Sequence, residues 1–417
     1  MASLAATLNE LAAGRRHWES LMTQVFAEPA AAIRPADDGF QRIIGFGTNP
    51  GHLRLWAFVP DALPPGAPLV VVLHGCGQGG PAYAAGAGWV ALAGRLGFAV
   101  LAPEQKRLNN PKGCFNWFSP ADMQGERGEA ASIRQMVLWM LTHYQLDRRR
   151  VFITGLSAGA AMAAALVTTY PGLFAGAALV AGVPFGAAAN VRDALHAMFE
   201  GRHRTAADWA ARAQEAAAAG GGVPATPSGW PRVSLWHGTA DAVVVPANAD
   251  ESIKQWTALH GVADSAPAIV RLGADTRRRW SDSRGRVVVE DHRLAGLGHG
   301  TPVDSRLRDE GGGEPGPFLI DAGVASSVQI AAFWGLDGAQ EQPVALRPLR
   351  LPPSAAAARA PARAPAAPVP LKPAARAATP VPAVPGPAMA DLKTAGPGAG
   401  TTAAGVAVAG PAERAAP

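Results

Sequence analysis

The first candidate for chemistry is a serine framed by two glycines, in the segment Gly155-Leu156-Ser157-Ala158-Gly159. It follows an apolar run at 151–154 and precedes an Ala-rich stretch with helical spacing, which predicts a tight turn between a buried strand and a helix. Glycines suit both flanks of such a turn because side chains there would clash. The pattern predicts that Ser157 is a nucleophile, although a serine before a helix also suits a simple helix cap.

A nucleophilic serine needs a histidine as base and an acid that orients it. Where the serine lies between a strand and a helix, the chain order is serine, acid, histidine. Asp241 comes just after the apolar run 233–236, and His299 lies in a Gly-rich loop after the run 286–291. We therefore expect His299 to take the proton of Ser157 and Asp241 to hold the imidazole in the required tautomer. The competing acids are Asp250 and Asp264, and the competing histidines are His237 and His292.

Hydrolysis by a serine also needs two backbone N–H groups that stabilise the oxyanion. The Ala158 amide is one candidate, because it opens the predicted helix, whose dipole favours negative charge. The Cys76 amide is the other, because His74-Gly75 after the buried run 69–73 lets the backbone turn sharply. Trp117, Trp230 and Trp236 are candidates for lining an acyl pocket, although tryptophans equally often belong to the core.

The same loop supports a rival interpretation. Gly75, Gly77 and Gly80 satisfy the G-x-G-x-x-G pattern of dinucleotide-binding proteins, and Glu104 lies where a ribose-binding acid would be expected. That interpretation would leave the predicted serine, acid and histidine without a role, so we favour hydrolysis. No metal or organic cofactor is expected.

The elements that must position these residues alternate between strands and helices. Such alternation predicts an α/β fold with a mostly parallel central sheet covered by helices on both faces. Strands are predicted at 52–58, 69–73, 98–102, 151–154, 174–180, 233–236, 268–272 and 286–291, and helices near 85–96, 125–145, 158–169, 187–219 in two pieces, 247–260 and 322–334.

Composition divides the chain into three parts. Residues 1–42 are predicted to be a helical arm and linker, with helical spacing over 3–28, and residues 43–337 a catalytic domain. Within this domain, 185–230 is expected to be a cap-like excursion over one edge of the sheet. Residues 338–417 contain 27 Ala and 16 Pro in 80 positions, so this tail is predicted to be disordered or polyproline-like.

Charge and hydropathy exclude several classes of function. The tail holds eight Lys/Arg against three acids, which accounts for the whole net charge of +5 among the 417 residues. A body without net charge argues against nucleic-acid binding. Residues 151–191 carry no charge, yet glycines and prolines interrupt them, so no transmembrane segment is predicted. The N-terminal sequence shows no recognisable signal peptide, which favours a cytoplasmic location.

Taken together, these motifs resemble the polyhydroxybutyrate (PHB) depolymerase-family esterases, which are α/β-hydrolases related to feruloyl and acetylxylan esterases. The resemblance spans roughly residues 43–336. It implies that Ser157, Asp241 and His299 are catalytic and that Cys76 and Ala158 are oxyanion donors. The motifs that carry it are Leu73-His74-Gly75-Cys76, Cys114-Phe115-Asn116-Trp117-Phe118, the Ser157 segment with Tyr170-Pro171, His237-Gly238-Thr239-Ala240-Asp241 and Gly298-His299.

The resemblance predicts a serine esterase that acts on poly(3-hydroxybutyrate) or hydroxyalkanoate oligomers, with feruloyl or acetylxylan-type esters as the alternative. A third hypothesis is a granule-binding protein in which a hydrolase-like domain serves for docking and the basic tail binds the polyhydroxyalkanoate granule. Because both cysteines lie in motif loops after neighbouring strands, we expect Cys76 and Cys114 to approach each other. Whether they form a disulfide would depend on the compartment.

Overall fold

A computed structural model of the chain describes residues 39–338 except 124 and 221–228. The chain divides into two units, Met1–Pro348 and Leu349–Pro417, and all described residues belong to the first. The helix predicted over 3–28 and the predicted tail, apart from residue 338, lie outside the described residues.

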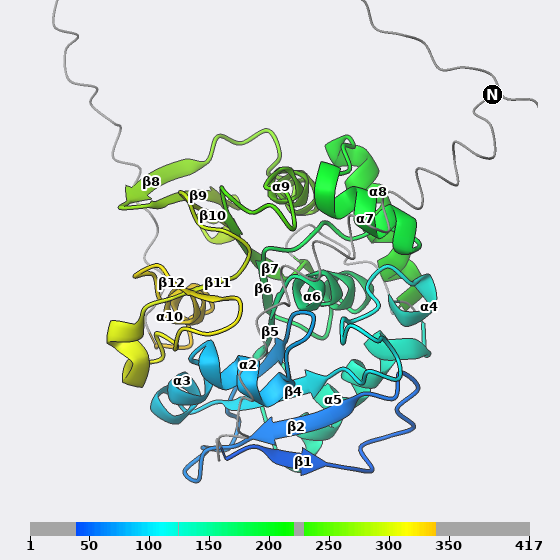
Figure 1. Ribbon diagram of the computed structural model, residues 1–417, viewed down its shortest axis with the longest axis vertical. Helices are drawn as coiled ribbons and strands as arrows, with labels where there is room; N and C mark the ends of the chain where they lie inside the picture. Colours follow the sequence, from blue (N-terminus) through cyan, green and yellow to red (C-terminus); the bar gives the residue numbers. More distant parts are fainter. Residues whose placement is uncertain (1–38, 124, 221–228, 339–417) are drawn as a thin grey trace, which may run out of the picture. The chain divides into compact units, whose positions relative to one another are not determined.

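A ten-stranded sheet forms the centre of the described part of the chain (Figure 1). Its six middle strands are parallel, and two antiparallel strands are added at each edge. In spatial order the strands are β1 (Gln41–Ile43), β2 (Arg54–Phe58), β4 (Ala99–Glu104), β3 (Leu69–Leu73), β5 (Val151–Leu156), β6 (Gly176–Val180), β7 (Arg232–Gly238), β10 (Val287–Leu294), β9 (Asp275–Ser281) and β8 (Ala268–Leu272). A separate parallel pair consists of β11 (Thr301–Val303) and β12 (Leu319–Asp321).

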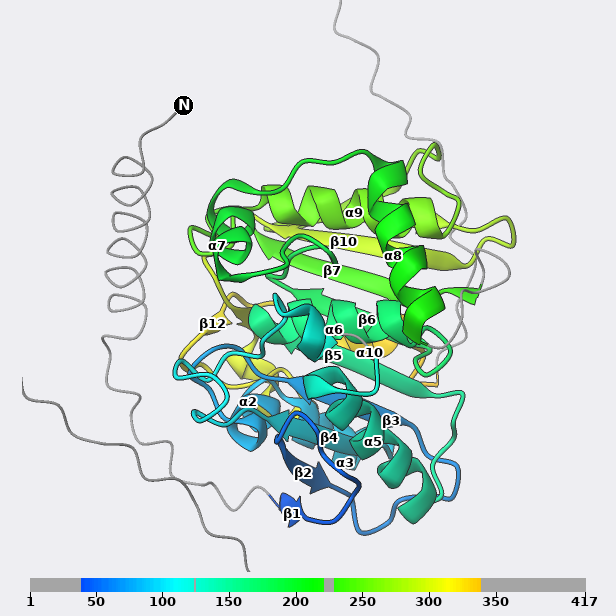
Figure 2. The ribbon, with the colours of Figure 1, turned by 90° about the vertical axis from the view of Figure 1, so that its right-hand side faces the viewer.

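Helices cover both faces of the sheet, as the side chains of β3 illustrate. Leu69, Val71 and Leu73 enter one core, and Val70 and Val72 enter the other, because successive side chains of a strand point to opposite faces. The first core is closed by α5 (Gly128–His143), α6 (Ala158–Thr169), α8 (Ala206–Gly220) and α9 (Ala247–Leu259), and the second by α2 (Gly80–Gly86), α3 (Trp89–Leu96) and α10 (Ser326–Phe333). Figure 2 shows α6, α8 and α9 on the near side of the sheet, with α10 behind it.

The predicted fold class is confirmed: the sheet is mostly parallel and helices cover both of its faces. The cap-like role predicted for 185–230 stays a prediction. The segment joins the central strands β6 and β7, and its helix α8 packs on α6 and α9. The remaining elements are two short helices, α4 (Pro120–Met123) and η2 (Ser305–Glu310), and α7 (Val191–Glu200) at the start of the 185–230 segment.

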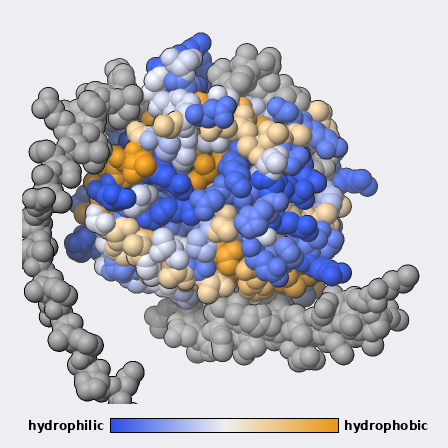
Figure 3. Space-filling view, turned by 90° about the horizontal axis from the view of Figure 1, so that it is seen from above, coloured by the Kyte–Doolittle hydropathy of each residue, from blue (hydrophilic) through white to orange (hydrophobic). Residues whose placement is uncertain are grey.

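The edge strand β8 is open to solvent and carries apolar side chains. Ile269 and Leu272 are each 52% exposed, and Arg271 lies between Val270 and Leu272. Figure 3 looks onto the top of Figure 1 and shows a mostly hydrophilic surface with separate apolar patches. A charged residue within an edge strand limits pairing with other chains. The parallel strands that hold the predicted site are all interior to the sheet.

Candidate active site

Ser157 occupies a strained turn between β5 and α6. Its φ and ψ are 57° and −116°, and its amide donates to the Val180 carbonyl at 2.9 Å. A Cβ on Gly155 would lie 2.5 Å from the backbone of Gly159, and a Cβ on Gly159 would lie 2.4 Å from the Leu73 carbonyl oxygen. The two glycines therefore let β5, α6 and the end of β3 approach closely, which fixes the half-buried serine at the carboxyl end of the sheet.

His299 and Asp241 are brought together by loops that follow the neighbouring strands β10 and β7. The His299 Nδ1 lies 2.8 Å from the Asp241 Oδ2. The two loops are tied by backbone bonds, because the Ala240 amide donates to the Leu297 carbonyl at 3.0 Å. Gly238 makes this contact possible, since a Cβ there would lie 2.1 Å from the same carbonyl oxygen.

The Asp241 carboxylate is fully buried and surrounded by donors. Its Oδ1 accepts hydrogen bonds from the amides of Val243 and Val244 at 2.9 and 2.8 Å, and the His237 Nε2 lies 3.4 Å from Oδ2. Burial alone would raise the pKa of Asp241, but the hydrogen bonds from His237 and His299 outweigh it and hold that pKa well below its usual value. Asp241 is therefore ionised and can orient His299 and stabilise its cation.

The three predicted catalytic residues thus follow β5, β7 and β10, which all end at the same edge of the sheet. Within the described part of the chain, neither the Ser157 hydroxyl nor the Nε2 of His299 has a hydrogen-bond partner. Both polar groups are free for a substrate. The Phe318 and His299 rings pack in a T-shaped arrangement, with ring centroids 6.0 Å apart.

Of the two predicted oxyanion donors, Ala158 is the first residue of α6 and Cys76 lies in the loop after β3. Cys76 and Cys114 form a disulfide with their Cα atoms 4.2 Å apart. On either side of Cys76, the Gly75 amide donates to the Gln78 Oε1 at 2.8 Å and the Gly77 amide to the Lys112 carbonyl at 2.9 Å. Among the described residues, the amides of Cys76 and Ala158 have no acceptor. Two such donors beside a serine can stabilise the negative charge of a tetrahedral intermediate.

A cavity of about 170 Å³ opens beside the serine, lined mainly by apolar side chains. Its walls include Ala158 and Ala161 from α6, and α7 contributes an apolar face. The polar residues Asn110 and Lys112 line it together with Ser157. The remaining lining residues are Cys76, Cys114, Trp117, Phe118, Ala181, Gly182, Val183, Val191, Ala194, Leu195, Met198 and Val244.

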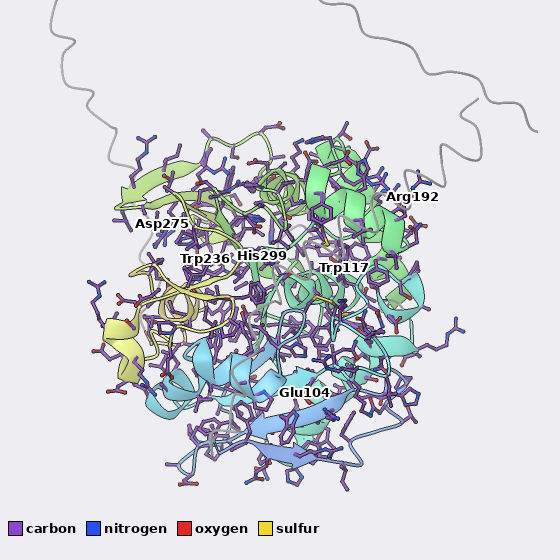
Figure 4. All side chains as sticks on the ribbon, viewed as in Figure 1. Glu104, Trp117, Arg192, Trp236, Asp275 and His299 are labelled. Atoms are coloured by element: carbon purple, nitrogen blue, oxygen red, sulfur yellow. A yellow bond between two sulfur atoms is a disulfide. The ribbon has the colours of Figure 1, made fainter. Side chains whose placement is uncertain are left out.

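Only one of the three predicted tryptophans lines this cavity. Trp117 does so, and Figure 4 shows it to the right of His299. The expectation for Trp230 and Trp236 is wrong, because both are core residues. Trp230 packs edge-to-face on Trp256, and Trp236 stacks on His292 at 3.6 Å between ring centroids.

Asp250, His292 and Glu104, three of the alternatives to the predicted residues, have other partners. Asp250 pairs with Arg293 at 2.8 Å, and His292 is buried between Asp275 and Glu290. Glu104, the acid of the dinucleotide interpretation, forms a 2.6 Å ion pair with Arg54. These side chains are engaged in ion pairs away from the serine, whereas Asp241 is the acid that reaches His299.

Sequence reasoning missed the α7 wall of the cavity. Its residues Val191, Ala194, Leu195 and Met198 have the spacing of one helix face, a signal that was present in the sequence. Without knowledge of the α7 position, that spacing indicates only an amphipathic helix. The same holds for Asn110 and Lys112, whose loop position carries no signal of its own.

In the described residues, no cluster of three or more His, Cys, Asp or Glu side chains could hold a metal ion. Nor is any helix of the described ranges both long and apolar enough to cross a bilayer.

Comparison with known proteins adds three findings. The family model "Esterase PHB depolymerase" matches residues 57–280. The chain is 40% identical to poly(3-hydroxyalkanoate) depolymerase C of Paucimonas lemoignei over 71% of this chain and 70% of that protein, and 28% identical to a probable acetylxylan esterase A of Aspergillus niger over 68% and 92%. An acetyl xylan esterase structure from Aspergillus awamori is similar with a TM-score of 0.60 and 25% identity, covering 71% of this chain and 99% of that one.

Proposed function

The chain belongs to the PHB depolymerase family of esterases, and from this premise we propose that it hydrolyses poly(3-hydroxybutyrate) or hydroxyalkanoate oligomers through an acyl-enzyme on Ser157. The observation that carries the proposal is the buried Asp241–His299 pair at the same edge of the sheet as the strained serine turn. We assign catalysis to a domain at 43–337, as the sequence predicts.

In the proposed mechanism, the Ser157 hydroxyl attacks the ester carbonyl while the Nε2 of His299 takes its proton. The amides of Cys76 and Ala158 donate to the oxyanion. His299 then gives the proton to the departing alkoxide, which leaves the acyl group on Ser157. Water, deprotonated by His299, attacks this ester and releases the hydroxy acid. Asp241 stays ionised throughout and stabilises the imidazolium.

The size and lining of the cavity support a short aliphatic acyl unit. An apolar cavity of about 150 Å³ holds one benzene molecule. The cavity beside Ser157 measures about 170 Å³, so it suits one short hydroxyacyl unit better than a complete feruloyl group. Acetylxylan-type esters are the second candidate, because a relative with 28% identity carries that name and an acetyl group also fits such a cavity.

The test begins with Ser157→Ala, which should abolish hydrolysis of p-nitrophenyl butyrate while leaving the circular-dichroism spectrum unchanged. Retained turnover would show that another nucleophile acts. The wild-type protein is then incubated with poly(3-hydroxybutyrate), its trimer, acetylated xylan and a feruloylated sugar, and the products are identified by mass spectrometry. Release of acetate or ferulate without hydroxybutyrate would overturn the polyester assignment.

Association with a granule surface is a separate proposal for the segment 338–417. It rests on the eight Lys/Arg and three acids of that segment. A basic tail would be attracted to the carboxylates that end the polyester chains at a granule surface. Deleting residues 338–417 should leave turnover of p-nitrophenyl butyrate unchanged and reduce the fraction of protein that sediments with granules. Equal sedimentation of both forms would remove the proposal.

A further inference from the structure

A buried carboxylate lies behind the candidate site and takes no part in the mechanism above. Glu129, at the start of α5, is 1% exposed. Its Oε1 accepts from the Gln105 Nε2 at 2.5 Å and the Asn116 Nδ2 at 2.8 Å, and its Oε2 accepts from the Asn116 amide at 2.8 Å. Among the described residues, no Lys, Arg or His forms an ion pair with it.

Such a site is costly to the folded state, because burial without a cation disfavours the charged carboxylate. Burial raises the pKa of Glu129 to about 7, against the effect of its hydrogen bonds. All three partners are N–H donors, so they match the carboxylate form.

Gln105, which donates to Glu129, is connected to Cys76 by two routes. In the first, the Gln105 Nε2 also donates to the carbonyl of Cys114 at 3.0 Å, and Cys114 is the disulfide partner of Cys76. In the second, the backbone amide of Gln105 donates to the Nε2 of His74 at 3.1 Å, and the His74 Nδ1 donates to the Gly75 carbonyl at 2.7 Å.

The second route defines the state of His74. Its Nε2 accepts from an amide, so the proton lies on Nδ1 and the ring is neutral. Burial, which lowers the pKa of His74, favours the same state. The neutral ring thus links the Gln105 backbone to the peptide group between Gly75 and Cys76.

Glu129 also restrains the wall of the acyl cavity. Asn116, which gives it two hydrogen bonds, accepts at its Oδ1 from the Asn110 Nδ2 at 2.9 Å. Trp117 follows directly in the chain, and Asn110 and Trp117 both line the cavity. The carboxylate therefore anchors both ends of a loop whose side chains form one wall.

We propose that Glu129 is a positioning residue for ester hydrolysis: it fixes the loop 105–118 and, through Gln105, the placement of the Cys76 amide toward the oxyanion. The proposal rests on the function proposed above. An oxyanion donor must be accurately placed, because removing one such donor typically costs about 100- to 1,000-fold in rate. A misplaced donor should therefore lower kcat more than it raises KM.

The first test is Glu129→Gln, which keeps the shape but turns one acceptor oxygen into a donor that opposes the N–H groups around it. We expect kcat for p-nitrophenyl butyrate to fall about 10- to 100-fold with KM within about twofold. The rate at which diethyl p-nitrophenyl phosphate phosphorylates Ser157 should fall by a similar factor, since its phosphoryl oxygen uses the same amides. The matched control is Glu126→Gln, whose carboxylate is exposed and paired with Arg134, and which should leave both rates unchanged.

Two further variants keep the test decisive if Glu129→Gln does not fold. Gln105→Met removes the link to the Cys114 carbonyl and leaves the bonds of Glu129 to Asn116, and Glu129→Asp retains the charge at a shorter reach. Each should lower kcat and the phosphorylation rate together. Wild-type rates in folded Gln105→Met and Glu129→Asp, whatever their melting temperatures, would overturn the proposal. Failure of the proposed function is distinguishable, because the phosphate ester would then not label Ser157 in the wild-type protein.

Discussion

The His299 Nδ1 lies 2.8 Å from the Asp241 Oδ2, although 58 positions separate the two residues in the chain. The contact depends on the parallel pairing of β7 with β10, in which Gly238 is opposite Leu294. After that last pair, β7 continues into the loop that carries Asp241, and β10 continues into the loop that carries His299. The register of β7 and β10 thus determines how the His299 imidazole is oriented.

We expect Asp241→Asn to lower kcat for p-nitrophenyl butyrate about 10,000-fold, because the Asn amide favours the wrong tautomer of His299 and cannot stabilise its cation. Steady-state kinetics at pH 7 to 8 measures the loss. Asp250→Asn is the control, since Asp250 is half exposed and pairs with arginines outside the site. A loss of less than about tenfold in Asp241→Asn would mean that another acid orients His299.

Ala194→Leu should shorten the range of acyl chains that the enzyme accepts. Ala194 is buried on the face of α7 that lines the cavity, so a larger side chain occupies space that the acyl group needs. We expect kcat/KM for p-nitrophenyl octanoate to fall at least tenfold more than that for the acetate. Arg192→Ala, on the exposed side of α7 (Figure 4), should leave the ratio unchanged. An unaltered ratio in Ala194→Leu would place the acyl chain elsewhere.

Lys112→Gln should raise KM for oligomers that end in a free carboxylate. Lys112 is the basic residue among those that line the cavity, and an exposed ion pair contributes up to about 1 kcal/mol, which corresponds to about fivefold in KM. The measurement compares KM for the 3-hydroxybutyrate trimer and its methyl ester at low and high salt. The difference between the two substrates should shrink both in the variant and at high salt. Lys106→Gln, which lies outside the cavity, is the control.

Gly159→Ala should destabilise the fold by about 1–3 kcal/mol, because its Cβ would lie 2.4 and 2.6 Å from the carbonyl oxygens of Leu73 and His74. Urea unfolding measures the difference. Gly172→Ala is the matched control, since a Cβ at Gly172 has no heavy atom within 4 Å. Equal stability of the two variants would contradict the close approach of α6 to β3.

His260 should make folding stability depend on pH. Burial lowers its pKa to about 4, and its Nε2 donates to the Pro231 carbonyl at 3.0 Å. Because the folded-state pKa lies below the unfolded value of about 6.5, the contribution of this group is complete above pH 6.5 and is lost as the pH falls toward 4. The loss is on the order of 3 kcal/mol.

His260→Gln should not show this loss, so the difference in free energy of unfolding between wild type and variant should decrease from pH 7 to pH 4. Urea titrations at several pH values measure it. His143→Gln, at the exposed end of α5, is the control. A difference that stays constant over this range would show that His260 titrates normally.

The sequence predicted those features that depend on local patterns. The serine turn, the acid after β7 and the histidine after β10 each lie in a short motif, and their chain order restricts how they can meet. The apolar runs likewise predicted the parallel strands, because strands buried on both faces read as continuous apolar segments.

Features that depend on pairing between distant segments were missed. The strand β9 contains three consecutive arginines, and it is stable because Arg278 and Arg279 pair with Asp291 and Glu290 of β10. Trp236 could be only a candidate for the pocket or the core, because its stacking on His292 depends on the β7–β10 register, which no local pattern shows. The contacts of Glu129 join residues 13 to 24 positions away through a loop without a periodic pattern.

The disulfide has a practical consequence for spectroscopy. It contains both cysteines of the chain, so the oxidised protein presents no thiol to a maleimide dye. A single cysteine introduced at an exposed position such as Arg192 would thus be the sole attachment point for a fluorophore. Such a probe on α7 could report on ligand entry in real time without a cysteine-free background.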